Sequence, residues 1–271
     1  MPNNYAGLVA KVREKSPLVQ QITNFVTVND CANITLAIGA SPIMADAIGE
    51  SADIAAISGA LVLNMGTLDE ADVRSMVSAG RSANANGVPV VFDPVGAGAS
   101  KLRNDTVALL TGELKLSVIR GNISEIKYVA GVASQTKGVD AAQGDMDDPG
   151  RVGQMTKALA QKLGCTVVVS GAVDVLSDGE RLAFVENGHP MLTRLTGTGC
   201  MCSALIGSFC GAHGDPLEAS VAAMLTMGIA GEIAYEKAGR LGNGNFHTAL
   251  LDAVSLMDAN TLERMAKCRE G

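Results

Sequence analysis

The chain has 271 residues, of which 47% are hydrophobic and only 3% aromatic, and its formal net charge is −7. Its isoelectric point is about 5.0, and it contains no run of basic residues. These values argue against nucleic acid and against an anionic membrane as partners. The length suits one large α/β domain, and we expect residues 1–271 to form a single domain.

Location is indicated by what the sequence lacks. No stretch reaches the roughly 18 uninterrupted apolar residues that a membrane-spanning helix needs. The segment from Met1 to Tyr5 does not have the basic-then-apolar pattern of a secretory signal. The six cysteines follow no regular spacing, so we interpret them as reduced thiols rather than metal ligands. Together these features predict a cytoplasmic protein.

Short apolar runs alternate with amphipathic segments through the first half of the chain. We expect strands at residues 61–64, 88–93 and 116–120, with Pro89 at the start of its strand. Thr67 to Glu70 matches a capping box and predicts a helix start. Further helices are expected over residues 102–110 and from about Asn122 onward.

The second half continues the alternation after a polar segment, residues 131–150, that we interpret as a surface loop. A helix over residues 152–163, a strand over 165–170 and a hairpin over 174–185 follow. Asp215 and Pro216 predict the start of a long helix with a buried stripe from Leu217 to Ile233. The order of elements predicts the α/β class, with a mainly parallel central sheet and helices on both faces.

Thr196 to Cys200 is the most informative motif of the chain. Two glycines alternate with threonines directly before a small-residue apolar run of helix length. The amides of Gly197, Thr198 and Gly199 would then lie at the positive end of a helix and form an anion hole. Cys200 would lie beside the anion as a candidate catalytic residue, although it could also be an ordinary apolar helix residue.

Polar side chains also follow the predicted strands. Because the carboxyl ends of parallel strands share one edge of a sheet, we expect Asp93, Arg120, Glu125 and Ser170 near the motif. Asp93 and Glu125 are candidate Mg²⁺ ligands, and Arg120 is a candidate phosphate ligand. This equipment suits phosphoryl transfer, and the chain has no Walker A lysine motif.

Each of these residues also has a structural interpretation. Asp93 could start a turn before Pro94, and Glu125 could favour the first turn of a helix. A buried Arg120 needs either a ligand or a carboxylate beside it. Ser170 alone is more often a turn residue.

Several segments together resemble the hydroxyethylthiazole kinase family, the thiamin-salvage members of the ribokinase-like superfamily. The resemblance runs nearly from end to end of the chain. The segments that carry it are residues 17–27, 40–44, 64–67, 93–97, 120–125 and 196–200.

This resemblance implies a ribokinase-like fold and the ATP-dependent phosphorylation of 4-methyl-5-(2-hydroxyethyl)thiazole. It also implies Mg²⁺ and a homotrimer with active sites between subunits. The family pattern assigns Arg120, Asn122 and Ser170 to ATP, with the Asn122 to Glu125 motif supporting Mg²⁺. It assigns Asn24, Met44, Gly66 and Gly197 to the thiazole pocket.

Cys200 stands where most of the superfamily has an aspartate base, and the thiazole kinases share the cysteine. A helix N-terminus lowers a thiol pKa, whereas nearby phosphate raises it, so Cys200 acts either as a weak base or only to position the alcohol. Other functions stay open at this point. They are a hydroxymethylpyrimidine or pyridoxal kinase, an ATP- or ADP-dependent nucleotide-hydrate dehydratase, and a non-catalytic nucleotide-binding module.

Overall fold

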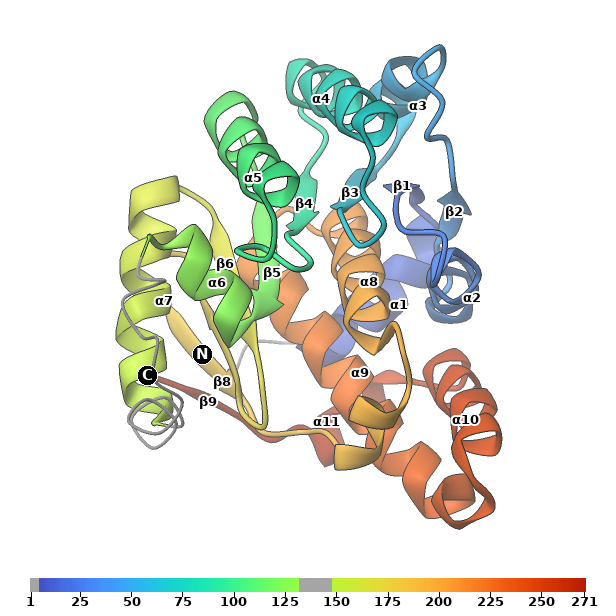
Figure 1. Ribbon diagram of the computed structural model, residues 1–271. Coiled ribbons are helices and arrows are strands. Elements are labelled where there is room, and N and C mark those ends of the chain that lie inside the picture. The colour runs from blue at the N-terminus through green and yellow to red at the C-terminus, as the bar shows by residue number, and fades with distance from the viewer. Residues whose placement is uncertain (1–4, 132–147) are drawn as a thin grey trace.

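The computed structural model describes residues 5–131 and 148–271, and its strands form one nine-stranded sheet in the order β2-β1-β3-β4-β5-β6-β7-β8-β9 (Figure 1). Neighbouring strands from β2 to β6 are parallel, and β7 to β9 continue the sheet with antiparallel pairing. The strands are β1 (Leu18–Ile22), β2 (Ser41–Ile43), β3 (Ala60–Asn64), β4 (Val90–Asp93), β5 (Val118–Asn122), β6 (Thr166–Ser170), β7 (Asp174–Ser177), β8 (Leu182–Val185) and β9 (Cys268–Glu270).

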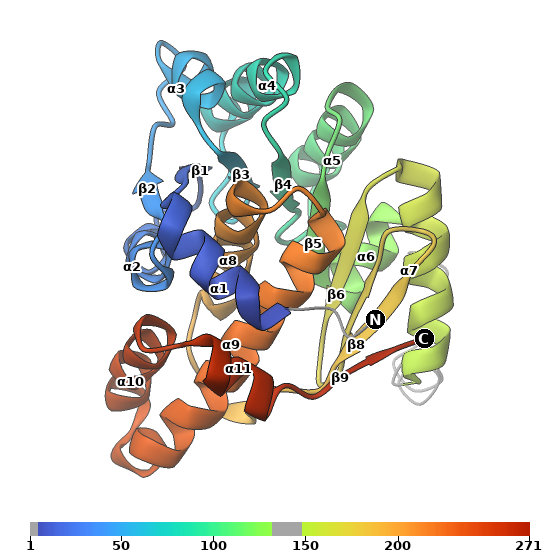
Figure 2. The ribbon, with the colours of Figure 1, turned by 180° about the vertical axis from the view of Figure 1, so that it is seen from behind.

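Helices cover both faces of this sheet, as the sequence predicts (Figures 1 and 2). They are α1 (Tyr5–Lys15), α2 (Val28–Ile38), α3 (Ser51–Ile57), α4 (Glu70–Ala85), α5 (Lys101–Glu113), α6 (Ile123–Val129), α7 (Pro149–Leu163), α8 (Thr198–Ala212), α9 (Pro216–Ala238), α10 (Asn243–Ser255) and α11 (Ala259–Met265). Two short 3₁₀ helices, η1 (Pro190–Arg194) and η2 (Gly239–Leu241), flank α8 and α9.

Side-chain alternation along the strands divides the interior into two cores. Val62, Val91 and Val118 face the core that α1, α2, α8 and α9 cover. Leu63 and Phe92 face the opposite core, which α4, α5 and α7 cover. Successive side chains of a strand point to opposite faces, so a strand buried on both sides is apolar throughout.

The two central helices of the first core are buried all round. Eleven residues of α8 are buried, and Gly207 allows close approach because a Cβ there would lie 2.5 Å from Val62. The sequence predicts a buried stripe on α9, and in the structure most of this helix is buried on all sides. Within the predicted stripe, Ile233 is half-buried and the other residues are buried. The helix over Pro216–Leu241 is long and apolar enough to span a membrane, yet 83% of its apolar window is buried inside the protein. Within the described part of the chain it is therefore a core helix.

Most expected elements are confirmed, with one clear error. The helix after β3, α4, has Asp69 as its N-cap. The Asp69 side chain accepts from the amides of Ala71 and Asp72, and Asp72 completes the capping box. The capping box predicted from Thr67 to Glu70 is therefore wrong, because Asp69 and Asp72, two residues later, have the same spacing and form the box instead. Residues 132–147 of the expected loop lie outside the described residues, and the single domain over 1–271 stays a prediction.

Strand register brings the polar strand ends together. Asn64 of β3 pairs with Asp93 of β4, and Asn122 of β5 pairs with Ser170 of β6. The amino end of α8 reaches the same edge of the sheet, where Ser203 of α8 donates a hydrogen bond to Asp93. The fold therefore assembles the candidate site at the carboxyl ends of four neighbouring strands.

Candidate active site

The amino end of α8 requires its two glycines. Gly197 has a φ of +84°, and a side chain there would overlap the methyl group of Thr27. A Cβ at Gly199 would lie 2.5 Å from the Nη1 atom of Arg120. The first intrahelical bond runs from the amide of Met201 to the carbonyl of Gly197, so the amides of residues 198–200 precede the helical ladder. This geometry supports the anion hole expected at Gly197, Thr198 and Gly199, which stays a prediction.

Cys200 lies against two buried amides on the other side of the helix end. Asn24 Nδ2 donates to Cys200 Sγ at 3.2 Å, and Asn64 Nδ2 donates to the same sulfur at 3.3 Å. Asn24 also donates to Asn64 Oδ1 at 2.9 Å and accepts from the amide of Thr27 at 3.1 Å. The thiol is half-buried, and hydrogen bonds of their own hold both amides in place.

The pKa of Cys200 is raised rather than lowered. Burial is the largest cause and the charge of Asp93 adds to it, while hydrogen bonds from Thr27, Asn24 and Asn64 oppose the shift. Burial thus opposes the lowering that a helix N-terminus gives to a thiol. At neutral pH the sulfur carries its proton.

Asp93 occupies the centre of the site with no exposed surface. Its Oδ2 atom accepts from Asn64 Nδ2 and from Ser203 Oγ, both at 2.8 Å, and lies 3.8 Å from Arg120 Nη1. Burial raises the pKa of Asp93, and the charge of Arg120 partly offsets this. One carboxylate thus contacts side chains from both halves of the site.

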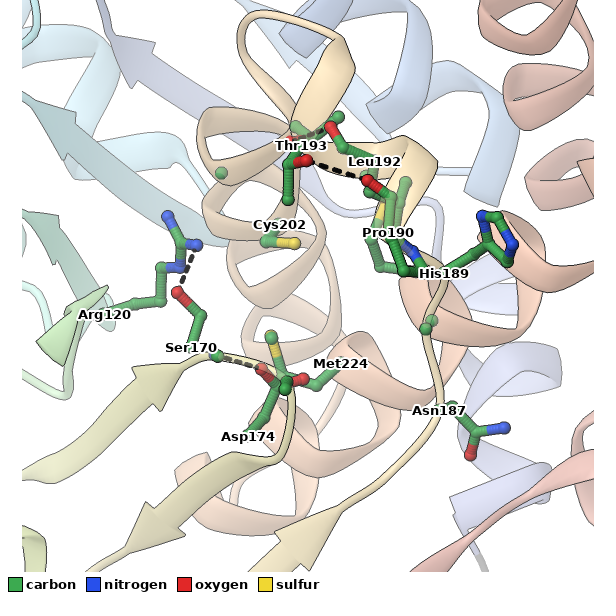
Figure 3. A pocket seen from close by; sticks show the side chains of 17 residues that line it. Arg120, Ser170, Asp174, Asn187, His189, Pro190, Leu192, Thr193, Cys202 and Met224 are labelled. Atoms are coloured by element: carbon green, nitrogen blue, oxygen red, sulfur yellow. Dashed lines mark hydrogen bonds between the residues drawn. The ribbon is translucent and has the colours of Figure 1, made fainter. Parts of the chain in front are cut away.

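Arg120 and Ser170 lie together, as the sequence predicts. Arg120 Nη2 donates to Ser170 Oγ at 2.7 Å, and both side chains line a cavity of about 660 Å³ together with Thr198, Gly199 and Cys202 (Figure 3). A cavity of this volume is in the range of small-molecule and cofactor sites. The guanidinium lies between the buried Asp93 and the open space, where it can meet an anionic ligand.

Two residues of this cavity escaped the sequence analysis. Asp174 at the start of β7 is 7% exposed and accepts from the amide of Gly171 at 2.9 Å. His189 lines the opposite wall (Figure 3). Its ring stacks on Tyr235, with ring centroids 3.6 Å apart. In the sequence, Asp174 is distinguished only by its place shortly after a predicted strand, and His189 only by its place before Pro190. Neither signal is specific.

Glu125 and Asn122 form a capping box at the start of α6. Asn122 accepts from the amide of Glu125 at 2.9 Å, and the carboxylate accepts from the amides of Asn122 and Gly96 at 2.8 and 3.0 Å. The structural interpretation of Glu125 as a first-turn residue is therefore confirmed. Asn122 is exposed, and the role of both residues toward ATP or metal stays a prediction.

A magnesium ion fits this donor set when phosphate supplies further ligands. Among residues 5–131 and 148–271, no three His, Cys, Asp or Glu side chains are placed to hold a metal ion by themselves. The Oδ1 atom of Asp93 is buried without a hydrogen-bond partner in this part of the structure, as expected of an oxygen that a water or ion engages. Mg²⁺ is commonly held by one or two carboxylates, several waters and substrate phosphates.

Gly66 and Met44 are the remaining residues that the sequence predicts at the site. A Cβ at Gly66 would lie 2.8 Å from Asn24, so Gly66 packs directly on that amide. Met44 follows β2 and packs on the core shared by α2 and α8. Arg103, which has no sequence signal, donates to the carbonyls of Met65, Gly66 and Val95 and ties the loops after β3 and β4 together. Substrate roles for Asn24, Met44, Gly66 and Gly197 stay predictions.

Asp174 supplies a pH test of the cavity. Burial raises its pKa to about 7 from the ordinary 3.8, although the Gly171 amide and Arg120 oppose the shift. The folded state thus holds this proton more tightly, and stability falls as pH rises from about 4 to 7. Asp174→Asn has no titrating group at this position and does not lose stability in this way. The free energy of unfolding of the variant, relative to that of the parent, should therefore increase by about 1.4 kcal/mol for each unit that the pH rises in that window. Urea denaturation at pH 5, 6 and 7 checks this, and a constant difference contradicts the assignment.

The comparisons with known proteins agree on one family. Residues 9–260 match the hydroxyethylthiazole kinase family. A hydroxyethylthiazole kinase from Ruminiclostridium cellulolyticum is 56% identical over 97% of this chain and 96% of its own length. The solved structure of a hydroxyethylthiazole kinase protein from Pyrococcus horikoshii superposes with a TM-score of 0.89 at 40% identity, covering 98% of both chains.

A more distant match supports the wider fold. A ribokinase-like superfamily protein from Enterococcus faecalis superposes with a TM-score of 0.61 at 12% identity, covering 89% of this chain and 88% of that one. The fold is therefore ribokinase-like, as the strand order and the helices on both faces also indicate. With family matches over nearly the whole length, this chain belongs to the hydroxyethylthiazole kinase family.

Proposed function

We propose that this chain transfers the γ-phosphoryl group of ATP to the hydroxyl of 4-methyl-5-(2-hydroxyethyl)thiazole. The observation that carries this proposal is that consecutive residues at the amino end of α8 face two different groups of side chains. Gly199 faces the guanidinium of Arg120 and the large cavity, whereas Cys200 faces Asn24 and Asn64. A phosphoryl group held at the amides between them would be in reach of both a donor and an acceptor.

The donor side is the cavity of Arg120 and Ser170. Arg120 neutralises phosphate charge, Ser170 orients the guanidinium, and Asn122 lies at the neighbouring strand end. The amides of Gly197, Thr198 and Gly199 stabilise the charge that spreads over the transferred group. Catalysis of this kind is mostly positioning and electrostatic stabilisation.

Magnesium belongs on the same side, and Asp93 and Glu125 are the residues that would hold it. When bound with ATP, the ion neutralises charge on the phosphates. The Oδ1 atom of Asp93, which is buried without a hydrogen-bond partner among the described residues, supports this role. Glu125 keeps its two amide contacts and would act through water, because Mg²⁺ gives up its hydration shell reluctantly.

The acceptor side consists of Asn24, Met44, Gly66 and Gly197, which would hold the thiazole alcohol beside Cys200. Because burial raises the pKa of the thiol, little thiolate is available to act as a base at neutral pH. Cys200 would therefore orient the hydroxyl more than remove its proton. A loose phosphoryl-transfer transition state tolerates this, since the hydroxyl proton can leave late.

We further propose a homotrimer with active sites between subunits, working in the cytoplasm. Phe25 directly follows Asn24 and is 77% exposed. Four more exposed apolar side chains, Val26, Leu36, Ile48 and Ile57, belong to the same part of the chain, which contains the edge strand β2. Apolar side chains gathered at one edge are typical of an interface. Light scattering should give three times the 27.7 kDa chain mass, and a monomer would contradict the assembly.

All six cysteines are free thiols, which suits the proposed location in the reducing environment of the cytoplasm.

A panel of alcohols tests the proposed reaction. With Mg²⁺ and ATP, the thiazole alcohol should be phosphorylated with a kcat/KM roughly tenfold or more above hydroxymethylpyrimidine and pyridoxal. Chelation of the metal should stop turnover. Mass spectrometry identifies the product. Faster turnover of another alcohol, nucleotide-hydrate dehydration, or nucleotide binding without turnover would each replace the proposal with one of its alternatives.

Cys200→Ala tests the acceptor side separately. We expect kcat to fall about ten- to hundredfold while the KM for the thiazole changes little, because the thiol acts on the reacting hydroxyl. Cys210→Ala, a buried thiol on the same helix, is the matched control and should leave kcat unchanged. An unchanged kcat in Cys200→Ala, measured by steady-state kinetics, removes the cysteine from the mechanism.

A further inference from the structure

Asn64 has no role yet in the proposed reaction, although it forms hydrogen bonds with four residues of the site. It is the last residue of β3 and is 2% exposed. Nδ2 donates to Asp93 Oδ2 at 2.8 Å and to Cys200 Sγ at 3.3 Å. Oδ1 accepts from Asn24 Nδ2 and from the amide of Gly66, both at 2.9 Å. All four hydrogen-bonding positions of its amide are therefore occupied.

The orientation of this amide is set by the backbone. The Gly66 amide can only donate, so it must face the oxygen of Asn64, which turns Nδ2 toward Asp93 and Cys200. The same reasoning applies to Asn24, because its oxygen accepts from the amide of Thr27. Neither side chain can be reversed without leaving an N–H group opposite another N–H group.

Two N–H donors on one sulfur restrict the thiol. Cys200 Sγ accepts from Asn24 and Asn64, so its own hydrogen must point away from both amides. Both amides are buried. A hydrogen bond with Thr27 is the third contact of the same thiol.

We propose that Asn64 is a positioning residue, locked by Asp93 and the Gly66 amide, that holds Cys200 Sγ as a hydrogen-bond acceptor and favours its thiolate form. The hydrogen bond to the sulfur distinguishes it from Ser203, whose hydroxyl donates to the same Asp93 oxygen and approaches the carbonyl of Gly199. The link to catalysis rests on the proposed function, whereas the state of the sulfur can be measured without substrate.

Alkylation of Cys200 by iodoacetamide tests this contact. Below its pKa, the reaction rate of a thiol follows its thiolate fraction, and loss of a hydrogen bond to the charged sulfur is worth about one pKa unit. At pH 8.5, Asn64→Ala should therefore slow alkylation of Cys200 about tenfold. Mass spectrometry of the Cys200 peptide separates this thiol from the other cysteines. Ser203→Ala is the matched control and should alkylate at nearly the parent rate.

The opposite sign would overturn the proposal. If Asn64 only fills space, its removal opens the pocket, and Cys200 should react at the same rate or faster. Asn64→Asp preserves the shape and the Gly66 contact but removes the donor to the sulfur, so it should also slow alkylation. Circular dichroism verifies the fold of each variant. In the kinase assay both Asn64 variants should lower kcat with an unchanged KM for ATP, and failure of that assay alone would implicate the proposed function instead.

Discussion

The site depends on one buried carboxylate. Asp93 ends a central strand with no exposed surface, and a charge in such a place is costly unless its neighbours stabilise it. Those neighbours are Asn64, Ser203 and Arg120, which come from β3, α8 and β5. The hydrogen bonds and the ion pair that stabilise the Asp93 carboxylate therefore align β3 and β5 with the amino end of α8. Through Arg120 it reaches the donor cavity, and through Asn64 it reaches Cys200.

The amino end of α8 then separates the two halves. Its glycines allow a close approach that a side chain would block, since the guanidinium of Arg120 lies directly against Gly199 and Thr27 lies against Gly197. Neighbouring residues of a helix point in different directions, so Gly199 and Cys200 face different spaces. The anion hole proposed between them is the point where donor and acceptor meet. The same crowding explains the raised pKa of Cys200, because burial removes water from the thiol.

Much of this arrangement could be predicted from the sequence because it follows from local rules. Apolar strands ending in polar residues predicted the shared edge, and parallel pairing then placed Asp93, Arg120 and Ser170 together. Asn64 stood in a recognised segment without a role, because its four partners come from residues 24, 66, 93 and 200. Arg103 and Asp174 were missed for the same reason. Burial and long-range contact decide what they do, and neither is visible in a local pattern.

The most direct measurement concerns the claim that Asp93 supports both halves of the site. Calorimetry would compare Asp93→Asn with the parent for ATP in the absence of Mg²⁺, which removes any metal contribution, and for the thiazole alcohol. Asp105→Asn, an exposed ion-pair partner of Lys101, is the control. We predict that both dissociation constants rise about tenfold in a folded Asp93→Asn protein, because Arg120 and Asn64 each lose a charged partner. An affinity left unchanged for either ligand would contradict the account.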